Sequence, residues 1–141
     1  MSVSPPLTRT IGQTERALQA LLARQLAATG TSFAEWAAMT LLYGGRMSEE
    51  QLGSALAKGN IAGRDEAAAL IAALVERGTI ATEAGTLGLT QQGATFYEPL
   101  RAAVGRATDT LFADIAPGDL DATRRTLDLV AQRAAEMTAV A

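Results

Sequence analysis

The sequence predicts a mostly α-helical fold with one small β-hairpin, and three observations support this prediction. Of the 141 residues, 48% are hydrophobic and only 4% are aromatic, with alanine prominent. Alanine is the best helix former and is weak in strands. Apolar residues recur at three- and four-residue spacing over most of the chain, as in amphipathic helices. Two very short runs with strand character, 80–82 and 87–89, flank a turn at 83–86.

The composition excludes several kinds of chemistry. The chain has no cysteine and no histidine, which excludes disulfides, Cys/His zinc sites and nucleophiles activated by histidine. No acidic cluster has the spacing of a metal-binding loop. We therefore expect no enzymatic activity and no cofactor. A basic segment followed by an apolar run is missing at the start, as is an uncharged apolar stretch of 18 residues, so we expect a cytoplasmic protein without a membrane span.

Two helices are predicted in the first third of the chain. Residues 1–9 contain two prolines and indicate a loose arm. A helix is expected over about 10–28, because leucines recur there at helical spacing, and Gly30 ends it. Thr31 or Ser32 then caps a second helix at 33–43, which two glycines break.

A pair of helices joined by a turn follows. The segment Ser48-Glu49-Glu50-Gln51 fits a capping box, which predicts a helix to about 57. After a turn at 59–60, a helix over about 62–77 is expected, ending at Gly78. Its apolar face is predicted to be buried through the residues Ala67, Leu70, Ile71, Leu74 and Val75.

Two long helices are predicted after the hairpin. Thr90 is expected to cap a helix to about 115, in which Pro99 introduces a kink or marks a later start. Asp119 is expected to cap the last helix. Apolar and small residues follow there with strict three- and four-residue spacing, a narrow seam typical of helix pairing: Leu120, Thr123, Leu127, Val130, Ala134 and Met137.

A helix, a very small hairpin and a second helix are the order in which a winged helix-turn-helix appears in a sequence. Leu74-Val75-Glu76-Arg77-Gly78 resembles the helix-ending pattern L-x-x-[KR]-G, and Leu89-Thr90-Gln91-Gln92-Gly93 matches L-T-x-x-G. In this element order, the two motifs make nearly the whole chain similar to the MarR family of bacterial transcription regulators.

The resemblance implies a single MarR-like domain over 1–141, with a winged-helix lobe at about 33–93 and dimerisation helices at about 10–28 and 94–139. It implies a homodimer that binds a pseudo-palindromic double-stranded DNA operator through successive major grooves, most simply as a ligand-responsive repressor. Helix pairing through Leu120, Leu127, Val130 and Met137 would form the dimer, although this seam can also pack within one chain. The family often binds small phenolic or other anionic ligands near the junction of the lobe and the dimerisation region.

The residues available for DNA contact are few. On the helix at 62–77, the positions outside the buried stripe are Ala68, Ala69, Ala72, Ala73 and Glu76. Groups able to contact DNA occur near its start: Lys58, Asn60 and Arg64, of which Arg64 is suited to a bidentate contact with guanine. Equally, Arg64 fits a solvated helix start.

The hairpin turn holds one acid and no base, whereas the family's wing typically carries an Asp-x-Arg signature. Residues 46–89 contain four basic and six acidic residues, a net charge of −2. Phosphate contacts supply much of the affinity for DNA, so this balance predicts weak or strongly salt-sensitive binding.

Two alternatives remain open. The alternative to a DNA-binding regulator is a degenerate winged-helix protein that serves as a protein-interaction or small-ligand-binding module without strong DNA binding. Aromatic residues and a methionine are candidates for an effector pocket as well as for ordinary core packing: Trp36, Met39, Tyr43, Phe96 and Tyr97.

Overall fold

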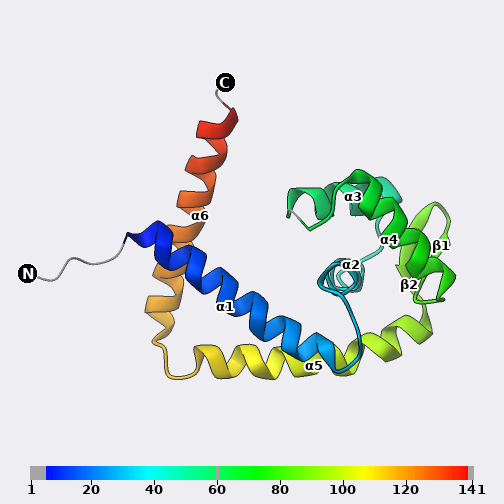
Figure 1. Ribbon diagram of the computed structural model, residues 1–141, viewed down its shortest axis with the longest axis horizontal. Helices are drawn as coiled ribbons and strands as arrows, with labels where there is room; N and C mark the ends of the chain where they lie inside the picture. The colour runs from blue at the N-terminus through cyan, green and yellow to red at the C-terminus, as the bar shows by residue number, and fades with distance from the viewer. Residues whose placement is uncertain (1–5, 60, 140–141) are drawn as a thin grey trace, which may run out of the picture. The chain divides into compact units, whose positions relative to one another are not determined.

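The computed structural model describes residues 6–59 and 61–139, and this part of the chain contains six helices and one antiparallel pair of strands (Figure 1). The elements in order are α1 (Leu7–Ala27), α2 (Phe33–Tyr43), α3 (Glu49–Lys58), α4 (Arg64–Glu76), β1 (Ile80–Glu83), β2 (Thr86–Leu89), α5 (Gln91–Phe112) and α6 (Pro117–Ala139). The predicted fold class is confirmed. Contacts divide the chain into two compact units that meet within α5, between Gly105 and Arg106. No helix in these described ranges is both long and apolar enough to cross a membrane.

Local capping sets the start of the helices in the lobe. The Gln51 backbone N–H donates to Ser48 Oγ at 3.0 Å, and the Ser48 N–H donates to Gln51 Oε1 at 2.8 Å. This is the capping box that the sequence predicts for α3. The same reciprocal pair forms between Ser32 and Glu35 at the start of α2. Both helices therefore begin where their own side chains satisfy free backbone donors.

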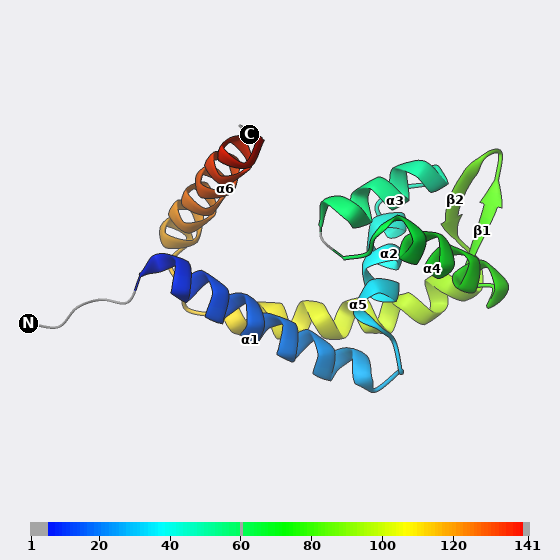
Figure 2. The same cartoon turned by 45° about the horizontal axis from the view of Figure 1, so that its top comes forward.

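The core of the lobe lies where α2, α3, α4 and the hairpin meet, and in both ribbon views α3 and α4 lie next to α2 (Figure 2). Its buried residues are Ala37, Ala38, Leu42, Leu52, Leu56, Ala62, Ala67, Ile71, Leu74, Ile80 and Leu87. The core combines small alanines with larger leucines and isoleucines, and the alanines let the helices approach closely.

The hairpin is short and has a two-residue turn. Ile80 pairs with Leu89 and Glu83 with Thr86, while Ala84 and Gly85 form the turn with φ of 52° and 81°. Positive φ at both positions is typical of a tight type I′ hairpin. Met47 adds a single bridge on the other edge, because its backbone N–H and C=O both bond to Leu87, at 3.1 and 2.7 Å. The loop before α3 is thereby fixed against β2.

The structure corrects several details of the sequence prediction. Helix α6 begins at Pro117 and not after Asp119, because proline suits the first helical position, where no N–H is needed. Helix α5 runs through Pro99 without a later start, and it ends at Phe112. Val75 is 42% exposed instead of buried. It directly follows the buried Leu74, and a step of 100° turns its side chain away from the core.

One close backbone approach joins the lobe to α5. A Cβ atom placed on Gly93 would collide with the carbonyl oxygen of Thr79, so only glycine fits at this position of the helix. Thr90 lies beside it. Its N–H donates to Thr79 O at 3.1 Å, and its hydroxyl accepts from the Gly93 N–H at 2.9 Å. The motif Leu-Thr-x-x-Gly is therefore a helix cap combined with a close contact.

We expect Gly93→Ala to destabilise the fold by about 1–3 kcal/mol, because the Thr79 backbone cannot move aside as a flexible side chain would. Gly105→Ala is the matched control: it is on the same helix, and a Cβ there meets nothing within 4 Å. That variant should be neutral or more stable by about 0.5–1 kcal/mol. Urea unfolding measures both, and equal effects would contradict the assigned contact.

Candidate functional site

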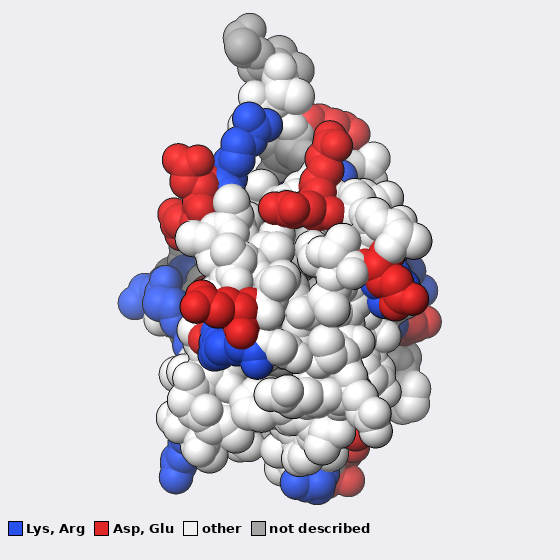
Figure 3. Space-filling model, turned by 90° about the vertical axis from the view of Figure 1, so that its right-hand side faces the viewer, with Lys and Arg blue, Asp and Glu red and all other residues white. Residues whose placement is uncertain are grey.

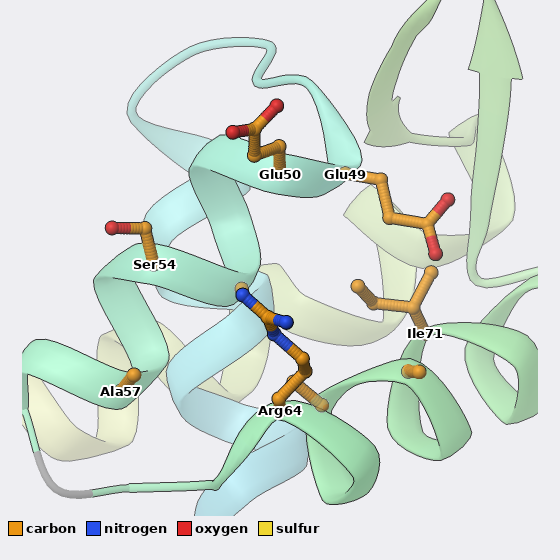
Figure 4. A pocket seen from close by; sticks show the side chains of 9 residues that line it. Glu49, Glu50, Ser54, Ala57, Arg64 and Ile71 are labelled. Atoms are coloured by element: carbon orange, nitrogen blue, oxygen red, sulfur yellow. The ribbon is translucent and has the colours of Figure 1, made fainter.

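Helices α3 and α4 form an open groove of about 430 Å³ on the surface of the lobe (Figure 4). Glu49, Glu50 and Ser54 line it from α3, and Arg64 and Ile71 line it from α4. Gly63 precedes α4, and no side-chain cap bond forms there among the described residues. The helix dipole favours negative charge at this end, and Asp65 and Glu66 in the first turn already supply it.

Two of the three DNA contacts predicted from the sequence lie at the end of α3 and at the start of α4. The exposed Arg64 extends from the first turn of α4 towards α3, across the groove (Figure 4). Among the described residues it has no ion-pair partner, despite the nearby acids. Lys58 is the exposed last residue of α3. Asn60, the third candidate, lies outside the described residues.

The outer face of α4 is apolar and small. Ala68, Ala69 and Ala72 are exposed, as the helical pattern predicts, and Ala73 is half-buried. Val75 extends this apolar surface towards the end of the helix. Such a face can contact a thymine methyl group, but it donates no hydrogen bond to a base edge.

A basic residue that was not predicted from the sequence to contact the hairpin, Arg46, lies against it in the structure. Arg46, in the loop before α3, donates from Nε to Thr86 Oγ1 and from Nη2 to the Thr86 carbonyl, both at 2.9 Å. Nη2 also lies 3.5 Å from the Glu83 carbonyl oxygen. The hairpin thus carries an arginine that comes from about 40 residues earlier in the chain.

Charge is dispersed on the face of the molecule in Figure 3, where basic and acidic side chains alternate around a wide uncharged area. This pattern agrees with the net charge of −2 over 46–89. Any DNA contact therefore depends on a few individual cations and not on a broad basic surface.

The five candidates for an effector pocket do not share one cavity. Met39 and Phe96 line a cavity of about 340 Å³, together with the loop after α1, the end of α4 and Gln92. Tyr43 and Tyr97 pack on each other instead, with ring centroids 5.2 Å apart, and the Arg101 guanidinium lies 4.8 Å from the Tyr43 ring centre.

Two of these aromatic side chains have buried polar atoms that differ in their hydrogen bonding. The buried Tyr97 hydroxyl donates to Thr40 Oγ1 at 2.9 Å, so its hydrogen bond is made within the lobe. Trp36 packs against the core, and its buried Nε1 donates to no acceptor in the described part of the chain. Core packing therefore accounts for Tyr97, while the cavity is left to Met39 and Phe96.

An ion pair lines the same cavity. Arg77, which follows α4, pairs with Glu35 of α2. Burial by itself raises the pKa of the Glu35 carboxyl, but the hydrogen bond from Arg77, the bonds to Ser32 and the charge of Arg77 together lower it below its ordinary value. Glu35 is therefore ionised at neutral pH and holds the end of α4 against α2.

The seam predicted for helix pairing is open to solvent. Within the described residues, no residue of α6 is buried, and Leu127, Val130 and Met137 are 41%, 40% and 77% exposed. Leu120 is half-buried. A 23-residue helix with this much exposed apolar surface is typical of one that pairs with another chain.

Comparison with known proteins identifies the fold. No family model matches the sequence, and no curated protein matches it. Solved structures do match over nearly the whole chain. A MarR family protein from Bacillus stearothermophilus has a TM-score of 0.72 at 14% identity, with 92% of this chain and 93% of that chain covered.

Two further structures give the same result. MarR from E. coli in its reduced form has a TM-score of 0.69 at 18% identity, covering 91% of this chain and 95% of that one. A Mycobacterium tuberculosis MarR family protein in complex with DNA has a TM-score of 0.69 at 16% identity, covering 90% and 98%. The chain therefore has the winged-helix fold of MarR family proteins, as its two motifs predict.

We expect Glu35→Gln to lower the thermal midpoint at neutral pH, because glutamine can keep the capping box but not the ion pair with Arg77. The pKa of Glu35 is lower in the folded state than in the unfolded chain, where it is about 4.3, so its ionised form stabilises the fold at pH values above about 4.3. This stabilisation is lost as the pH falls through the pKa of the folded state. The difference between wild type and variant should therefore shrink between about pH 5 and pH 3.

Thermal unfolding across this pH range measures the effect. The exposed Glu76→Gln, at the end of α4, removes the same charge and serves as the control. A Glu35→Gln difference that stays constant with pH would show that the ion pair is not its source.

Proposed function

We propose that this chain is a cytoplasmic, homodimeric transcription regulator of the MarR type that binds double-stranded DNA through α3, α4 and the hairpin. The observation that carries the proposal is the shared arrangement of these elements with a family protein solved in complex with DNA. Exposed cations lie at the start of α4 and at the end of α3, which supports the proposal that these two helices contact DNA. Each lobe would then contact one half-site of a pseudo-palindromic operator.

The candidate DNA contacts differ in the role that we propose for them. Arg64 of α4 can read guanine through its two parallel donors, whereas Lys58 of α3 and Asn60 are proposed to contact the DNA phosphate backbone. The alanines beyond Arg64 allow the helix to lie deep in the major groove without adding hydrogen bonds. Recognition then depends on one base contact and on DNA shape.

A second copy of the chain is the proposed partner of the α6 seam. Leu120, Leu127, Val130 and Met137 would pair across a two-fold axis. The exposed apolar side chains near the end of α5 and just after it, Leu111, Phe112 and Ile115, extend the surface that such pairing would cover.

The cavity beside Glu35 and Arg77 is the proposed ligand site. Phe96 and Met39 suit a small aromatic ring, and an anionic group would compete with Glu35 for the positive charge of Arg77. Leu74 lies in the last turn of α4 and Arg77 directly follows it, so a ligand in this cavity would contact the end of the helix that is proposed to face DNA. A ligand that binds one lobe geometry better would shift the population away from DNA binding, as in a ligand-responsive repressor.

One observation favours the second candidate function, a protein-interaction module without strong DNA binding. The exposed face formed by Ala68, Ala69, Ala72 and Val75 is flat and apolar, which suits a protein surface better than a base edge. Failure of the 141-residue chain to bind any duplex at low salt would favour this function.

We expect Arg64→Ala to weaken binding to the specific operator by about 1–3 kcal/mol, with less loss on unrelated duplex. An operator can first be selected from genomic fragments at low salt, and fluorescence anisotropy then gives both affinities. Arg16→Ala, on an exposed position of α1, is the control of equal charge. Equal losses on the two duplexes would remove Arg64 from base recognition.

We expect Leu127→Glu to raise the dimer dissociation constant at least about tenfold, since a carboxylate would be buried without a partner. Leu129→Glu is the matched control: the two leucines are exposed to 41% and 44%, but a two-residue step puts them on different faces of α6. Sedimentation equilibrium distinguishes them. Identical behaviour of the two variants would contradict the predicted seam.

A further inference from the structure

Arg46 is seated on the hairpin in a way that fixes its guanidinium group. A Cβ atom on Gly88 would collide with Nη1, and it would lie 3.3 Å from Cγ of Arg46. Gly88 itself is buried. The absence of a side chain at position 88 therefore creates the seat for Arg46.

The hydrogen bonds of Arg46 leave part of the group available. Nε and Nη2 donate to Thr86 and to the Glu83 carbonyl, whereas Nη1 donates to no acceptor in the described ranges. Guanidinium has five N–H donors, and the two on Nη1 are thus open. The side chain as a whole remains exposed.

The charge of Arg46 is not neutralised. Its acceptors are a hydroxyl and two backbone carbonyls, and in the described part of the molecule no carboxylate lies within ion-pair distance of it. The group is a complete positive charge held in one orientation. Because the side chain is already ordered, binding an anion costs it little further entropy.

We infer that Arg46 supplies the hairpin with its DNA phosphate contact, through Nη1. The hairpin itself carries a single charged residue, Glu83 of β1, which repels DNA. Planar guanidinium fits a phosphate through parallel donors, and such a contact positions the protein without reading sequence. This inference rests on the proposed function, since it assigns a residue to the same interface.

A purely structural role is the competing explanation. Arg46 joins the loop before α3 to the hairpin, and losing that connection could weaken DNA binding by misplacing the hairpin. The two roles differ in their salt dependence. Each phosphate contact contributes about 0.9 to the slope of log affinity against log salt on duplex DNA, whereas a misplaced hairpin has no such fixed signature.

The test compares wild type with Arg46→Gln and Arg16→Gln, which remove the same charge from two exposed positions. Fluorescence anisotropy gives affinities for a selected operator and for a shuffled duplex at several salt concentrations. We expect Arg46→Gln to lower the slope by about 0.9 and to weaken both duplexes by a similar factor. The slope of Arg16→Gln should equal that of wild type.

Gly88→Ala keeps the test decisive if Arg46→Gln does not fold. A Cβ there displaces the flexible end of Arg46 and leaves its charge and the backbone in place. We expect weaker binding to both duplexes with little change in thermal midpoint. Unchanged binding in Gly88→Ala, or an unchanged slope in Arg46→Gln, would overturn the assignment.

The result also separates this inference from the proposed function. Wild type that binds no duplex at low salt would overturn the proposed function and this assignment together. Wild type that binds, with an Arg46→Gln slope equal to its own, would overturn only the role of Arg46.

Discussion

The lobe depends on one backbone junction, where the end of α4, both strands and the start of α5 meet within a few residues. Gly78 leaves α4 with φ of 79°, and the Thr79 N–H then bonds to Leu74 O at 3.0 Å. The Thr90 hydroxyl donates to the Gly78 carbonyl at 2.5 Å while it caps α5. Gly93 has no Cβ, which is what lets the Thr79 carbonyl approach the helix. The two ends of the hairpin are thus fixed to each other.

The properties of the hairpin follow from that junction. With both ends fixed and only four residues in each strand, the strands close through a two-residue turn, which has no room for a basic loop. The outer edge of β2 is then free to bond Met47, and this bridge brings Arg46 across Gly88. The tight turn of the hairpin has no room for a basic residue. The same hairpin holds Arg46, which comes from the loop before α3, across Gly88.

The sequence predicted what local chemistry determines. Capping boxes, glycine stops and apolar spacing act within a few residues, so the α2 and α3 boundaries and the hairpin were predicted to within one residue. The two family motifs were also informative because they are the two sides of one junction. Helix α6 differed at its start, since both Pro117 and Asp119 suit a first turn and the spacing could not choose between them.

Long-range pairings were not predictable in the same way. Arg46 contacts Thr86 at a separation of 40 residues, and Arg77 contacts Glu35 at 42. Neither pairing leaves a local pattern, because the residues beside an arginine in the sequence do not indicate which distant residue it contacts. One signal was present: Gly88 interrupts a strand where no turn requires it, and glycine inside a strand often marks the close approach of another group.

The sparse charge of the lobe makes dimerisation a condition of the proposed function and not an addition to it. A lobe with a net charge of −2 and a few separate cations gains little from counterion release, so a single copy would bind DNA weakly. Two lobes joined in one dimer bind adjacent half-sites as one event, because the second lobe acts at a high effective concentration. The exposed apolar seam of α6 and the weak basic surface of the lobe then have a common explanation. In the proposed dimer, joining two copies of the lobe would supply the DNA affinity that the individual contacts of α4 do not.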